Sequence, residues 1–66
     1  MDLAKSLRKA MAEKNIKGKD LAAAIDVPPS LISRWRQDGN MNHVNLVCIC
    51  KALEMRVHEF VKLGEE

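Results

Sequence analysis

The stretch AAAIDVPPSLISRW, residues 22–35, stops one short helix and starts another with almost no linker between them. Its first four residues favour a helix. Asp26 tolerates a left-handed backbone better than most residues do, and Pro28 cannot continue a helix because it lacks an N–H group and clashes with the preceding turn. Pro29 suits the first turn of a new helix. The stretch therefore predicts a helix, a sharp turn and a second helix.

The length and composition of the chain favour one small all-α domain. Its 66 residues contain only two aromatic side chains, Trp35 and Phe60. Alanine and the aliphatic residues must therefore fill the core, which suits short helices. No apolar run approaches the roughly 20 residues of a membrane span, and the first residues lack the apolar segment of a signal peptide. We expect a soluble, cytoplasmic protein that has no membrane partner.

The charge is spread unevenly along the chain. The net charge of the whole protein is +2, but residues 1–19 contain six lysine and arginine residues against two acids. Such a run can be a solvated helix face, or it can face an anionic partner.

The two cysteines, Cys48 and Cys50, do not predict a metal site. Residues two apart on a helix point about 200° away from each other, so this pair cannot easily share one metal ion or form a disulfide. His43 and His58 complete no zinc-binding spacing. We expect reduced thiols that act as small apolar residues, with no metal and no cofactor.

The apolar residues recur at helical spacing in five segments. We expect helices over residues 2–14, 18–25, 29–37, 43–53 and 57–63, with Asp2 and Asn42 as N-caps and residues 64–66 as a frayed tail. The side chains expected to face the core are Leu3, Leu7, Ala10, Met11, Leu21, Ala22, Ile25, Ile32, Trp35, Leu46, Ile49, Cys50, Leu53, Val57, Phe60 and Val61.

Residues 16–40, IKGKDLAAAIDVPPSLISRWRQDGN, resemble the phage Cro and repressor (XRE-like) helix-turn-helix family. Gly18, Ala22, Asp26, Ile32 and Trp35 match the spacing of the helix-turn-helix unit. Residues 44–61, VNLVCICKALEMRVHEFV, are similar to the family's fourth and fifth helices. The resemblance covers about residues 3–63. It implies a compact five-helix, lambda-repressor-like domain over residues 1–66, with the helix-turn-helix at about 18–37 in helices 2 and 3.

The sequence departs from the family at three positions. Many members have Gly where Asp26 stands, Gln where Gly18 stands, and Gly where Glu54 follows the fourth helix. The family's Gln often anchors to DNA, so only the backbone N–H can serve at Gly18.

The resemblance implies that the third helix enters the major groove of DNA and reads bases. Arg34 is the strongest candidate, because a guanidinium can bond O6 and N7 of guanine together; the alternative is a solvated surface arginine. Trp35 lies on the inward stripe, so we expect it in the core. The residues expected to contact bases are Pro29, Ser30, Ser33, Arg34 and Gln37.

Contacts to DNA phosphates are expected on the flanks of the third helix. They fix the position of the protein and carry most of the salt dependence of binding. The expected residues are Lys17, Gly18 and Lys19 before and at the start of the second helix, Arg36 on the third, and Asn40, Asn42 and His43 between the third and the fourth.

One such domain covers only a half-site, and small phage regulators usually pair on a pseudo-palindromic operator. A second apolar edge of the fourth helix could supply an isologous contact, although a more fully wrapped core would also explain it. The residues of the expected dimer interface are Val44, Val47, Cys48 and Met55.

Together these features predict a sequence-specific transcriptional regulator, a Cro-like phage repressor that binds double-stranded operator DNA as a homodimer, at least on DNA. The chain holds no catalytic constellation, so we expect no enzyme. It has no room for a separate domain that senses a small-molecule ligand, so we expect no such ligand. Two alternatives stay open. One is an antitoxin-like protein-interaction module with the same fold, and the other is a controller-type activator.

Overall fold

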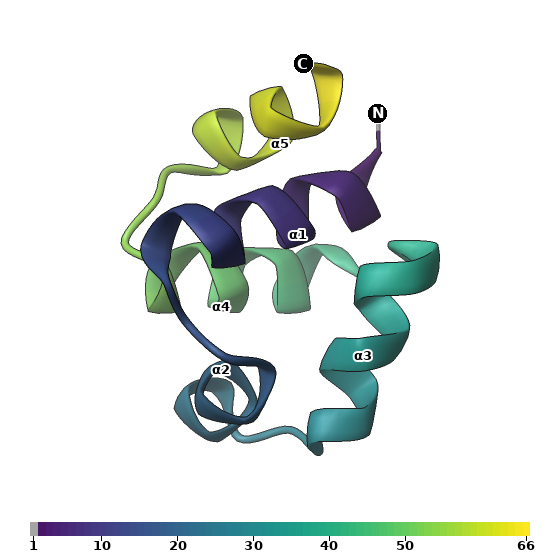
Figure 1. Cartoon of the computed structure of the whole chain (residues 1–66), viewed down its shortest axis with the longest axis vertical. Coiled ribbons are helices and arrows are strands. Elements are labelled where there is room, and N and C mark those ends of the chain that lie inside the picture. The colour runs from purple at the N-terminus through teal and green to yellow at the C-terminus, as the bar shows by residue number, and fades with distance from the viewer. Residues whose placement is uncertain (1) are drawn as a thin grey trace.

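Five helices make up the all-α fold, as the sequence predicts (Figure 1). The computed structural model describes residues 2–66. The helices are α1 (Leu3–Lys14), α2 (Gly18–Ile25), α3 (Pro29–Asp38), α4 (His43–Ala52) and α5 (Val57–Glu65). The predicted bounds agree with these to within two residues at each end. None of the helices in this part of the chain is long and apolar enough to cross a membrane.

Side-chain caps fix the first residues of two helices. The Asp2 carboxylate accepts a hydrogen bond from the Lys5 backbone N–H at 3.0 Å, which begins α1. The Asn42 side chain accepts one from the Asn45 N–H at 2.8 Å, which begins α4. Each bond satisfies an N–H that has no partner within its helix, and both predicted N-caps are confirmed.

Three helices end on a non-glycine residue in the left-handed conformation. Asn15, Asp26 and Glu54 have φ of 54°, 59° and 56°. After each, an N–H reaches back five residues: Val27 donates to the Ala22 carbonyl at 3.0 Å and Met55 donates to the Cys50 carbonyl at 2.9 Å. This bond closes the helix end. The left-handed turn expected at Asp26 is thus confirmed.

Glu54 is the most strained of the three, because asparagine and aspartate tolerate this conformation better than glutamate. We expect Glu54→Gly to raise the free energy of unfolding by about 0.5–1 kcal/mol. Glycine relieves the backbone strain of the left-handed conformation, and part of this gain is offset because glycine gives the unfolded chain more conformational freedom. The thermal midpoint should rise by about 4 °C, as measured by circular dichroism. Glu54→Ala also removes the exposed charge but keeps Cβ, so an equal gain in that variant would contradict this explanation.

The core lies where α1 meets α5 and α3, and where α4 meets α2 and α5. α1 packs most extensively against α5 and next against α3, and α2 contacts both α3 and α4 (Figure 1). Trp35 is only 3% exposed, so its predicted place in the core is confirmed. Of the predicted core residues, Leu3, Ile25, Val57 and Val61 are half-buried. The buried cluster consists of Leu7, Ala10, Met11, Leu21, Ala22, Ile32, Trp35, Met41, Leu46, Ile49, Cys50, Leu53 and Phe60.

The expected frayed tail at residues 64–66 is wrong for Gly64 and Glu65, which form the last turn of α5. Gly64 is half-buried, and a Cβ there would collide with the backbone carbonyl of Asp2 and the hydroxyl of Ser6. Ser6 is itself fully buried and donates to the Val61 carbonyl at 3.4 Å. A residue without a side chain therefore lets the end of α5 lie directly against the start of α1.

Candidate nucleic-acid interface

One face of α3 is polar and exposed, and the opposite face is buried. Ile32 and Trp35 are 1% and 3% exposed and hold the helix on the core. The exposed face carries residues at the helical spacing i, i+3, i+4 and i+7, which places them side by side. These are Ser30, Ser33, Arg34 and Gln37, with Pro29 exposed at the first position of the helix. The structure thus brings the expected base-contact residues together on one end and one face of α3.

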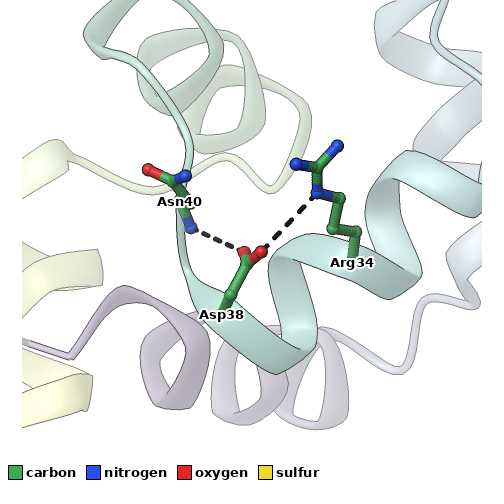
Figure 2. A network of polar contacts seen from close by, with 3 residues as sticks. All are labelled: Arg34, Asp38 and Asn40. Atoms are coloured by element: carbon green, nitrogen blue, oxygen red, sulfur yellow. Dashed lines mark hydrogen bonds and ion pairs between the residues drawn. The ribbon is translucent and has the colours of Figure 1, made fainter.

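Arg34 belongs to a small polar network at the end of α3 (Figure 2). Its Nε lies 3.6 Å from Oδ2 of Asp38, one helical turn later, and 69% of the Arg34 side chain is exposed. The other carboxylate oxygen of Asp38 accepts the backbone N–H of Asn40 at 2.8 Å. Asp38 therefore links the exposed arginine to the loop between α3 and α4.

A basic strip runs beside this face. Arg8 of α1 donates a hydrogen bond to the backbone carbonyl of Arg36. This carbonyl is one of the last of α3, and arginine side chains can satisfy such carbonyls at the end of a helix. Arg8 and Arg36 line two neighbouring hollows. Ser33 and Gln37 complete the first, and Lys17 and Gly18 belong to the second. The hollows run from the exposed polar face of α3 to the start of α2, and Arg8, Arg36 and Lys17 place positive charge along them.

The start of α2 is open to an anion. The first intrahelical bonds of α2 are those donated by Asp20 and Leu21 to the Lys17 carbonyl at 3.1 and 3.0 Å. The N–H groups of Gly18 and Lys19 precede them, and such groups at a helix start favour phosphate. Both flanking lysines are exposed.

The other expected phosphate contacts lie at the far end of α3. Asn40, Asn42 and His43 are exposed in the loop after α3 and at the first residue of α4. Gly39 begins this loop with φ of 65°, and a Cβ there would stand 2.6 Å from the Ala4 backbone nitrogen. The loop is therefore held close against α1, next to the Asp38 network.

The expected dimer residues are only partly together. Val44, Val47 and Cys48 occupy one face of α4 at the spacing i, i+3 and i+4, and Val44 is 68% exposed. Met55 lies beyond the other end of α4 and packs partly against the core. None of the four is among the residues that line the two hollows beside α3.

Two residues of this surface were missed from the sequence. Arg8 falls within the basic run of residues 1–19, which can be solvated or face an anionic partner, and Asp38 lies just beyond the helix predicted over residues 29–37. A signal for Arg8 exists: it directly follows buried Leu7, so it borders the apolar stripe of α1. Nothing in the local pattern shows that its guanidinium reaches α3.

Among the described residues, no cluster of histidine, cysteine and acidic side chains could hold a metal ion. Cys48 is exposed and Cys50 is buried, on opposite sides of α4. Burial raises the pKa of the Cys50 thiol, because desolvation disfavours the thiolate.

This difference predicts unequal thiol reactivity. In the native protein at neutral pH, a disulfide reagent should modify Cys48 quickly and Cys50 only as the fold opens, because the thiolate is the reactive form. Counting released chromophore over time should show one fast and one slow equivalent. Cys48→Ser should remove the fast phase alone; loss of the slow phase instead would contradict the assignment.

The α2–α3 pair, joined by a sharp turn at Asp26 and carrying an exposed polar face with flanking cations, is typical of the helix-turn-helix class of DNA-binding domain. The family model of the Cro/C1-type HTH DNA-binding domain matches residues 6–66, and the chain belongs to this family. A comparison with the curated proteins finds no match. The family assignment confirms the resemblance inferred from the sequence and makes DNA the partner.

Proposed function

We propose that this protein is a sequence-specific transcriptional regulator, a Cro-like phage repressor that occupies a pseudo-palindromic operator. The observation that supports this most directly is the polar face of α3, exposed opposite its buried Ile32 and Trp35. In this proposal α3 lies in the major groove, and Arg34 reads a guanine. Pro29, Ser30, Ser33 and Gln37 complete the base contacts. The activity is binding alone, in the cytoplasm of a bacterial host, with no catalysis, cofactor or small ligand.

The contacts to the DNA backbone come from both ends of α3. Lys17, the N–H groups of Gly18 and Lys19, and Arg36 would hold one phosphate segment. Asn40, Asn42 and His43 would hold another. We add Arg8 to the first group, because its side chain lines both hollows with Arg36. Phosphate contacts at both ends of α3 would fix the register of this helix in the major groove.

The test is a selection of bound duplexes from a random DNA library with purified protein at near-physiological salt. An inverted repeat with half-sites about 34 Å apart, one helical turn, is the expected product. If no sequence is enriched and binding is weak and strongly salt-dependent, the regulator proposal is overturned, and an antitoxin-like interaction module becomes the function to test.

The dimer of the proposal uses the exposed face of α4. Val44, Val47 and Cys48 would meet the same residues of a second copy, with Met55 at the edge, as an isologous contact requires. Val44→Asp should leave binding to a single half-site unchanged and reduce cooperative binding to the full repeat. Full cooperativity in this variant would exclude this interface. The control is Asn45→Asp, which introduces the same charge at a neighbouring position.

Repression by occupying an operator needs the fewest assumptions, because it requires no contact besides that with DNA. A controller-type activator would bind the same repeat and also touch polymerase. Repression and activation can be distinguished by measuring transcription, with and without the protein, from a promoter that carries the selected repeat.

A further inference from the structure

We propose that Asp38 is a positioning residue that decides which edge of the Arg34 guanidinium faces a guanine. This inference rests on the function proposed above, and it concerns how the reading residue is aimed. It starts from the network at the end of α3, in which Asp38 contacts both Arg34 and the backbone of Asn40 (Figure 2).

The carboxylate of Asp38 is itself held in place. Its Oδ1 accepts the Asn40 N–H at 2.8 Å, which fixes the plane of the group against the loop after α3. Its Oδ2 is then directed at Nε of Arg34, 3.6 Å away. This distance is that of an ion pair and is longer than a hydrogen bond. It can shorten to a charge-assisted hydrogen bond when DNA excludes water from the network.

An arginine can present two N–H groups to guanine in two ways: through its two terminal nitrogens, or through Nε and one of them. Because Nε faces Asp38, the pair of terminal nitrogens is left for O6 and N7. Figure 2 shows both terminal nitrogens of Arg34 on the side away from Asp38. Holding the long side chain this way also lowers the rotamer freedom lost when it binds.

Helix stability does not account for an acid at this position. A carboxylate in the last turn of α3 faces the negative end of the helix dipole. An arginine that precedes the acid by four residues is the less favourable order for a helical pair. Asp38 also adds a negative charge to a surface that would meet DNA phosphates. These costs are explained if its role is to direct Arg34.

The test compares Asp38→Asn with the wild type on the duplex that the wild-type selection yields. Asparagine keeps an oxygen for the Asn40 N–H and loses the charge that faces Nε. The measured quantity is the ratio of Kd for a duplex with the contacted guanine replaced to Kd for the selected duplex. We expect this ratio to fall about three- to tenfold. Binding to unrelated duplexes should stay the same or tighten, because a negative charge has been removed.

Two further variants isolate the cause. Asp38→Glu keeps the charge but lengthens the side chain that accepts the Asn40 N–H, so its ratio should lie between those of Asp38→Asn and the wild type. In an Arg34→Ala background, Asp38→Asn should leave the ratio unchanged, because there is no guanidinium left to aim. Circular dichroism of each variant checks that α3 is intact.

The outcomes separate this inference from the proposed function. An enriched repeat whose guanine preference is lost in Arg34→Ala but kept in Asp38→Asn overturns the positioning role alone. A fall of the ratio on Asp38→Asn in the Arg34→Ala background also overturns it, because the effect then does not act through Arg34. Failure of the wild type to enrich any sequence overturns the proposed function instead.

Discussion

Arg34→Ala should remove the preference for one guanine in each half-site while the protein still binds DNA. A bidentate contact to guanine contributes about 1–3 kcal/mol of discrimination, so specificity at that position should fall between about fivefold and about 150-fold. Affinity for unrelated duplexes should hardly change, because the phosphate contacts remain. Selection from the same random library, repeated with the variant, measures the effect at every position at once.

Arg36→Ala is the matched control on the same helix. Arg36 is exposed like Arg34. It lies two residues later, so its side chain points about 200° away around the helix, and it lines a hollow together with Arg8. We expect its loss to weaken binding to all sequences alike and to lower the slope of log affinity against log salt by about 0.9. A uniform loss from Arg34→Ala, with a sequence-selective loss from Arg36→Ala, would reverse the two assignments.

Phe60→Ala should leave the protein largely unfolded at 25 °C. The Phe60 ring is fully buried in α5, and α5 makes the most extensive contact with α1. Truncation of a buried phenylalanine costs about 3–5 kcal/mol. A single core in a chain of this size rarely supplies more than about 3–5 kcal/mol in total. The far-ultraviolet circular dichroism signal of the helices should therefore collapse.

Phe60→Leu keeps most of the buried volume and should cost less than about 1.5 kcal/mol, so it should remain folded with a lower thermal midpoint. If Phe60→Ala instead melts cooperatively with nearly the wild-type midpoint, α5 does not hold the fold together. In that case the stability resides in α1 to α4.

The local features of this fold could be predicted because they depend on neighbouring residues. Asp26 and Pro29 stop and restart the chain through their own backbone preferences, and Trp35 falls inside because Ile32 precedes it by one turn. The same spacing placed Ser30, Ser33 and Arg34 on one outward face. Glu54 departs from the glycine of many family members, and its positive φ gives that departure a physical cost.

The features that could not be predicted join residues far apart in the chain. The contact of Arg8 with the Arg36 carbonyl depends on how α1 crosses α3. The place of Gly64 in α5 depends on its contact with Asp2. Helical periodicity shows which side of each helix is apolar, but it does not pair one helix with another.

The close packing of α1 on α5 also bears on how the chain folds. The contacts join the first and the last helix and span almost the greatest separation that the sequence allows. The entropy of closing that long loop must be lost before these contacts form, so folding should be slower than in helical proteins built from local contacts. Amide hydrogens in the two terminal helices should then exchange together, with free energies close to that of global unfolding.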